Sequence, residues 1–157
     1  MNDRLVQKKI IPIIVGVIIV VAIVSVIYFN DIKNPDETKS QWISSGPFAI
    51  SKSQYKLGEN VFMTVHGLKP IENGQIVFIL PSGKPYVTIP FNGTLKTDFN
   101  YYFKPDTSAQ LKIYSPQDLV GTWRVVFQGV AYKPISFEFI NEFMPGEEND
   151  IVPIPTG

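Results

Sequence analysis

The chain of 157 residues contains no cysteine and a single histidine. The lack of cysteine excludes disulfide bonds, thiolate nucleophiles and zinc sites of the finger or ribbon type. His66 has no second imidazole with which to share a metal ion, and it is the only imidazole available to a catalytic triad. We therefore expect no enzyme activity, no catalytic or metal-ligating residue and no cofactor.

The chain also lacks an excess of either charge, since 14 Lys and Arg balance 14 Asp and Glu. A nucleic-acid-binding domain carries a basic footprint, which this balance does not provide. Phosphate-binding glycine loops and the G-x-S-x-G turn of serine hydrolases are missing as well. The composition predicts no nucleic-acid partner, and it does not name a biochemical activity.

One long apolar run stands near the N-terminus. Residues 10–29 hold no charged side chain, and fourteen of the twenty are Ile or Val. Twenty helical residues extend about 30 Å, the thickness of a bilayer hydrocarbon core. The run is longer than the apolar region of a cleaved signal peptide, and no pair of small residues marks a cleavage site near its end. We expect an uncleaved, single-pass transmembrane helix that acts as a signal anchor.

The segments on either side of this run set its orientation. Three Lys or Arg residues precede the run, and two lysines follow it within ten residues. By the positive-inside rule, we expect residues 1–9 to be cytoplasmic and the chain after residue 29 to lie outside the cell membrane. Residues 30–45 are polar, contain Pro35 and show no apolar period, which predicts a short solvated tether.

Residues 46–143 show the pattern of an all-β domain. Apolar and polar side chains alternate, and clusters of Gly, Pro, Asn and Asp interrupt them about every eight to twelve residues. In the clearest run, residues 94–104, Leu95 and every second residue up to Phe103 face one side. Seven such runs predict a seven-stranded antiparallel sandwich of immunoglobulin-like type.

Asn92-Gly93 separates two of these runs and predicts a hairpin, because both residues tolerate positive φ. With Thr94 it also forms the one N-x-T sequon of the chain, so Asn92 is a candidate glycosylation site if the domain is extracytoplasmic. At the other end of the chain, residues 144–157 hold three acids, three prolines and no base. We expect this segment to be a disordered acidic tail.

Two short motifs carry a family resemblance. The segment Tyr55 to Val61 (YKLGENV) resembles the Y-x-P-G-E-x-V sequence before the second strand of macroglobulin-like and related immunoglobulin-like domains. The segment Gly121 to Val125 (GTWRV) is similar to the G-x-W/Y-x-V sequence that begins their penultimate strand. Leu57 replaces the usual proline, and a thioester is impossible without cysteine. The resemblance implies an architecture and no activity, and it gives structural roles to Tyr55, Gly58, Glu59, Gly121 and Trp123.

The remaining candidates are polar or aromatic side chains on single strands and turns. Asp98, Asp106 and Asp118 lack the spacing of a calcium loop, and Asp118 is expected to accept backbone hydrogen bonds in a local turn. His66 is expected to face solvent. Tyrosines outnumber what a small core needs, and Tyr86, Tyr101 and Tyr102 are candidates for an interface with a partner.

Three functions remain open. The favoured one is a membrane-anchored, extracytoplasmic binding or structural module, an accessory subunit or partner of another membrane or envelope protein. A pilin-like assembling surface protein is the second, although residues 8–12 show neither the small processing residue nor the following glutamate of pilins. A small envelope enzyme or metal-binding domain is the third. The oligomeric state stays open.

Overall fold

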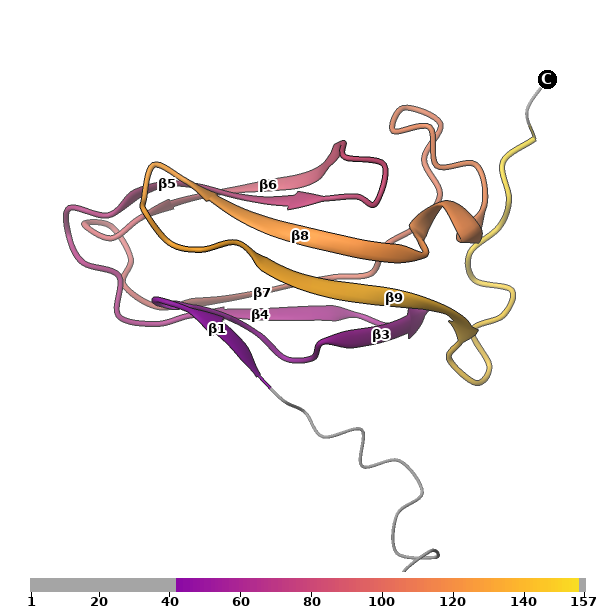
Figure 1. The fold of residues 1–157 in the computed structure, drawn as a ribbon, viewed down its shortest axis with the longest axis horizontal. Helices are drawn as coiled ribbons and strands as arrows, with labels where there is room; N and C mark the ends of the chain where they lie inside the picture. Colours follow the sequence, from indigo (N-terminus) through magenta and orange to yellow (C-terminus); the bar gives the residue numbers. More distant parts are fainter. Residues whose placement is uncertain (1–41, 156–157) are drawn as a thin grey trace, which may run out of the picture. The chain divides into compact units, whose positions relative to one another are not determined.

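The computed structural model describes residues 42–155, which form two β-sheets (Figure 1). The first sheet contains, in spatial order, β1 (Ile43–Ser45), β2 (Phe48–Ile50), β4 (Val61–Val65) and β7 (Phe99–Phe103). The second contains β3 (Gln54–Leu57), β9 (Ile135–Phe143), β8 (Gly121–Gln128), β5 (Asn73–Ile79) and β6 (Pro85–Asn92). The short 3₁₀ helix η1 spans Pro116–Leu119.

The all-β prediction is confirmed, and the count of seven strands is wrong, because residues 42–155 form nine. The two strands that the pattern missed are β1 and β3, of three and four residues. Elements this short contain too few residues to show alternation. The prediction that all strands are antiparallel is also wrong for β3, which pairs in parallel with β9.

The predicted transmembrane helix at 10–29, the segment 1–9 and most of the tether lie outside the described residues. Between residues 42 and 155, the structure contains no helix that is both long enough and apolar enough to cross a bilayer. The last three residues of the predicted tether, Ile43–Ser45, belong to the domain, since they form β1 and pair with β2.

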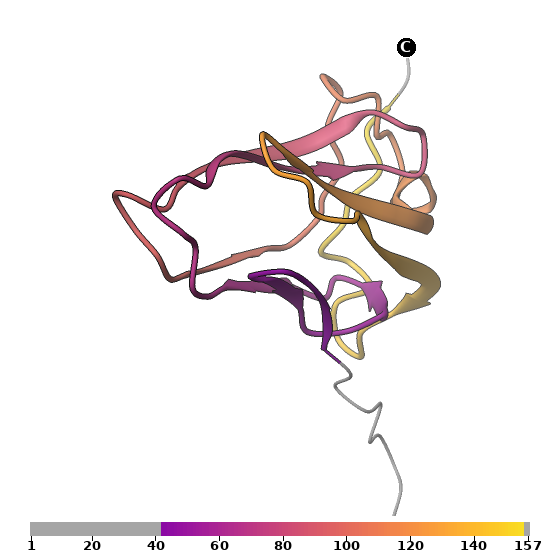
Figure 2. The same cartoon turned by 60° about the vertical axis from the view of Figure 1, so that its left-hand side comes forward.

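The core lies between the two sheets, which face each other as two layers (Figures 1 and 2). β4 shows the principle, since Val61, Met63 and Val65 are buried and the two residues between them are only partly covered. Alternate side chains of a strand point to opposite faces, so one face of each sheet supplies the core. Trp123 is fully buried, and its indole N–H donates to the carbonyl of Leu119 at 2.8 Å.

The connection from β6 to β7 corrects two expectations. Asn92-Gly93 does not close a hairpin, because β6 pairs with β5 in the second sheet and β7 pairs with β4 in the first. The carbonyl of Asn92 accepts hydrogen bonds from the amides of Leu95 and Lys96, and this tight turn ends the strand. The predicted strand at 94–104 therefore begins only at Phe99, and Leu95 is 83% exposed.

The tail corrects a third expectation, because residues 144–155 pack against the domain. Ile151 is 3% exposed and belongs to the core. The amide of Ile154 donates to the carbonyl of Tyr114 at 2.7 Å. The ammonium of Lys104 binds Glu147 and also Asp150, at 2.9 Å, and these two carboxylates raise its pKa to about 12. The tail itself contains no basic residue, but Lys104, the residue directly after β7, supplies one.

The buried position of Ile151 predicts that the tail contributes to stability. We expect Ile151→Ala to lower the free energy of unfolding by about 2–4 kcal/mol, since the truncation removes buried methyl groups and leaves a cavity. Val152→Ala is the matched control, because Val152 is 63% exposed and should change stability by less than about 0.5 kcal/mol. Denaturant unfolding of the full chain, followed by tryptophan fluorescence, measures both. Equal effects of the two substitutions would show that the tail does not pack.

Candidate functional site

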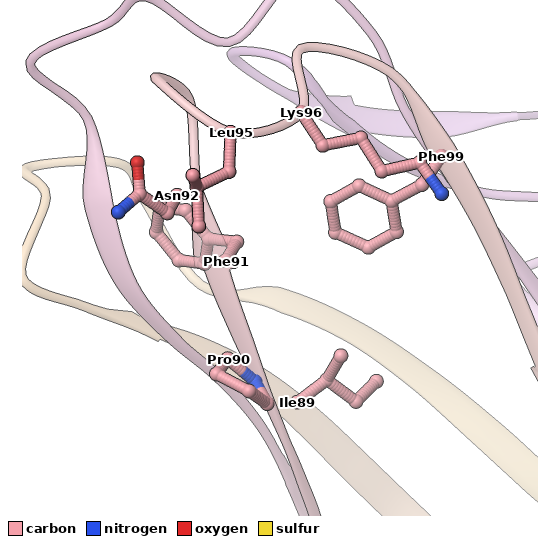
Figure 3. Close-up of a pocket in the computed structure, with 7 residues that line it drawn as sticks. All are labelled: Ile89, Pro90, Phe91, Asn92, Leu95, Lys96 and Phe99. Carbon is pink, nitrogen blue, oxygen red and sulfur yellow. The ribbon is translucent and has the colours of Figure 1, made fainter.

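The candidate site is an open groove of about 550 Å³ between the last strands of the two sheets (Figure 3). We call it the β6–β7 groove. Three segments line it: the end of β6, the turn that follows and the first residue of β7. Its lining residues are Ile89, Pro90, Phe91, Asn92, Leu95, Lys96 and Phe99.

The topology explains why this side of the sandwich is open. β6 ends one sheet and β7 ends the other, and the six residues between them form a turn and no further strand. Ile89 and Phe91 approach the groove from β6, and Phe99 approaches it from β7 (Figure 3). Leu95 stands at the rim and is mostly exposed. Leu95 extends the apolar surface of the half-buried Phe99 and Ile89, and contiguous apolar patches of this kind are found at contact surfaces.

Only one charged side chain lines the groove. The Nζ atom of Lys96 lies 5.8 Å from the centroid of the Phe99 ring, within reach of a cation–π attraction. No carboxylate, imidazole or tyrosine hydroxyl is among the lining residues. The groove therefore has no proton donor and acceptor pair for acid–base catalysis, and it can recognise apolar or aromatic groups.

His66 and Asp98 form the nearest approach to a catalytic pair. The Nδ1 atom of His66 lies 3.2 Å from a carboxylate oxygen of Asp98. Asp98 also accepts hydrogen bonds from the Thr97 hydroxyl at 2.6 Å and the Gly67 amide at 3.0 Å, and these contacts lower its pKa, with the Thr97 hydroxyl contributing most. Both side chains are more than half exposed, so the pair is a solvated loop contact. Residues 42–155 contain no group of three His, Cys, Asp or Glu that could hold a metal ion.

The residues of the first motif stabilise the start of the domain. Tyr55 is 1% exposed, its hydroxyl lies 3.1 Å from that of Ser51, and burial raises its pKa. Gly58 has a φ of +84°, a conformation that other residues rarely adopt. Glu59 accepts a hydrogen bond from the Lys56 amide at 2.9 Å and forms an ion pair with Lys52. These contacts close the turn between β3 and β4.

The second motif begins β8, directly after the turn that contains Asp118. The carboxylate of Asp118 accepts hydrogen bonds from the backbone amides of Ser115 and Tyr114, at 2.9 and 2.8 Å. These two contacts, that of Ser115 first, lower its pKa. Gly121 has a φ of +121° and begins β8, two residues before the buried Trp123. Neither motif contributes a residue to the β6–β7 groove.

The three candidate interface tyrosines have different surroundings. Tyr86 is the extra residue of a β-bulge, because Phe78 pairs with Val87 while Ile79 pairs with Pro85. Its ring lies 5.2 Å from that of Trp123, its hydroxyl accepts the Asp106 amide, and burial raises its pKa. It therefore belongs to the packing. Tyr101 is partly covered on β7, and Tyr102 is 71% exposed on the outer face.

Asn92 lies at the rim of the groove and is exposed. Its side-chain oxygen accepts a hydrogen bond from the Thr94 amide at 2.9 Å, and the Thr94 hydroxyl donates to the carbonyl of Pro70 at 2.7 Å. These contacts hold the sequon in a defined turn. Glycosylation of Asn92 stays a prediction.

Leu95, Lys96 and Phe99 are functional candidates that the sequence pattern placed on a regular strand. Their position at a groove depends on where the turn after Asn92 ends, and the alternation of side chains does not report this. Comparison of the chain with models of protein families and with curated proteins finds no match. The groove is therefore interpreted from its own geometry.

The Asp118 turn predicts a pH-dependent stability. The ionised carboxylate is favoured in the folded state, so its contribution is present above the unfolded pKa of about 3.9 and is lost as the pH falls through the lowered folded pKa. We expect Asp118→Ala to destabilise the full chain by up to about 1 kcal/mol at pH 7, as for loss of a helix cap, and by less below about pH 4. Glu148→Ala, at an exposed carboxylate, is the control. Thermal unfolding of the parent and of both variants across this pH range measures the effect. If the stability difference between Asp118→Ala and the parent did not change with pH, the ionised carboxylate would not be the stabilising group.

Proposed function

We propose that the protein is a non-catalytic binding or structural module, anchored in the cell membrane by residues 10–29 and displayed outside the cell. Its partner in this proposal is another membrane or envelope protein, or a further copy of the same chain. The β6–β7 groove is the contact surface. The observation that carries the proposal is that the groove is apolar and open, with one lysine and no acid–base pair among its lining residues.

The described core supports a binding role over a catalytic one. Residues 42–155 bury no polar or charged residue, and none of their buried side-chain polar atoms lacks a hydrogen-bond partner. Active sites usually hold buried, perturbed titratable groups in a cleft. The groove offers instead a patch of side chains of the kind that contact surfaces use.

We further infer that the domain is an immunoglobulin-like sandwich. The order β9-β8-β5-β6 corresponds to the strands G, F, C and C′ of that fold, and β2-β4-β7 corresponds to A, B and E. The parallel pairing of β3 with β9 fits a chain that contributes its first strands to both sheets. This order supports the macroglobulin-like and immunoglobulin-like resemblance of the two motifs, which remains a proposal about ancestry.

The anchor proposal predicts how the full chain fractionates. We expect it to stay in the membrane pellet after alkaline carbonate extraction, because twenty uncharged, mainly β-branched residues span a bilayer. We also expect external protease to remove the domain from intact cells. Recovery of the chain in the supernatant, or protection of the domain until the cells are lysed, would contradict the topology.

The groove proposal predicts that a charge at its rim disrupts binding. Leu95→Asp should lower the yield of cross-linked complexes in native membranes about tenfold, because a carboxylate buried against apolar side chains costs at least about 1.4 kcal/mol. Val152→Asp is the matched control, since Val152 is also an exposed apolar residue and lies on the tail, at the other end of the domain from the turn after β6 (Figure 1). Both variants should fold as the parent does. An equal yield from Leu95→Asp and the parent would show that the groove is not the contact surface.

A further inference from the structure

Three of the four strands at the edges of the two sheets carry features that prevent pairing with another chain. β1 and β3 are only three and four residues long. β6 contains Pro85 and Pro90, which lack the amide proton that a neighbouring strand would need. Short strands, prolines and charges are the devices by which edge strands avoid edge-to-edge association.

β7 carries none of these devices. Its five residues, Phe-Asn-Tyr-Tyr-Phe, include no proline and no charge, and aromatic residues favour strands. Within residues 42–155 it pairs only with β4, so its second edge is free. An uncharged aromatic strand with a free edge is a site for addition of a further strand.

The backbone groups on the free edge can be assigned from the neighbouring strands. The carbonyl of Phe62 accepts a hydrogen bond from the amide of Ser51, and the amide of His66 donates to the carbonyl of Pro47. The even-numbered residues along β4 therefore direct their backbone amide and carbonyl groups toward β2. The residues between them, such as Met63, direct their backbone groups toward β7. Their partners in β7 are Phe99, Tyr101 and Phe103. Asn100 and Tyr102 therefore direct their amide and carbonyl groups to the free edge.

The sequence of β7 is self-complementary about Tyr101. In an antiparallel pair of two β7 strands centred on Tyr101, Asn100 of one copy lies opposite Tyr102 of the other. These are the two residues with free backbone groups, so both such pairs can exchange hydrogen bonds. Phe99 then lies opposite Phe103 of the other copy, and the two Tyr101 residues face each other. Aromatic cross-strand pairs of this kind stabilise sheets.

The charges around β7 also fit this register. Asp98 and Lys104 flank the two ends of β7, so this register brings Asp98 of one copy to the same end of the strand pair as Lys104 of the other. The attraction is weak, because Lys104 already binds Glu147 and Asp150 and Asp98 already contacts His66. No pair of like charges meets at the two ends. The β6–β7 groove shares Phe99 with this edge, so strand pairing would also bring a second copy over the groove.

We propose that the partner of the groove is a second copy of this chain, which pairs its β7 antiparallel with the first β7 in the register centred on Tyr101. This proposal rests on the proposed function and specifies its partner. The result is a two-fold dimer in which the first sheets of both copies form one continuous sheet of eight strands, since each copy contributes four.

The absence of cysteine makes the register directly testable in the full chain. In the proposed dimer, Tyr101→Cys places two thiols directly opposite each other, at a pair without backbone hydrogen bonds, where Cα atoms are about 4.5 Å apart and a disulfide can form. Asn100→Cys is the matched control. Its two thiols lie diagonally, about 7–8 Å apart, beyond disulfide geometry. Each variant is oxidised mildly in membranes and analysed on a non-reducing gel.

We expect at least about tenfold more disulfide-linked dimer from Tyr101→Cys than from Asn100→Cys, and we expect Leu95→Asp to suppress it. Equal yields from the two cysteine variants would overturn the proposal. A benzophenone amino acid at Tyr102 identifies the alternative in the same membranes. Cross-linking to a different protein would overturn the second copy as partner and leave the binding function intact. Cross-linking to nothing, together with no disulfide, would contradict both.

Discussion

The close approach of Gly93 to the loop before β5 determines the arrangement of the open side of the domain. The amide of Gly93 donates to the carbonyl of Glu72, and a Cβ atom at this position would lie only 2.0 Å from the carbonyl oxygen of Lys69. The chain can therefore turn sharply after β6 and cross to the other sheet. If it instead continued as a hairpin, β7 would pair with β6, and the groove and the free edge would both be lost.

The inward faces of the longer strands could be predicted because burial imposes a period of two residues on them, as in β4 and in the first half of β9. The pairing partners of those strands could not be predicted in the same way. An Asn-Gly pair can join two neighbouring strands or lead the chain from one sheet to the other, and the sequence Asn92-Gly93 does not distinguish the two. Leu95 shows the consequence. It continues the alternation of β7 in the sequence, but the turn takes it out of the strand and exposes it.

The tail shows a second limit of composition. The tail contains three carboxylates, three prolines and no basic residue, and a segment of this composition would be solvated if it stood alone. Its order comes from groups more than thirty residues earlier in the chain, such as Lys104 and Tyr114. Candidate residues identified by chemistry, including His66 and Asp118, are loop and turn contacts, whereas most of the groove's lining residues are apolar and carry no chemical signature.

The parallel pairing of β3 with β9 has a consequence for how the domain reaches its folded state. Gln54 and Glu138, which face each other across this pair, are 84 residues apart in the sequence. The second sheet therefore cannot be completed until almost the whole polypeptide has been synthesised, because its last strand to emerge stands between two earlier ones. β3, one of the first strands to be synthesised, therefore waits for its only neighbour in the second sheet until β9 has emerged.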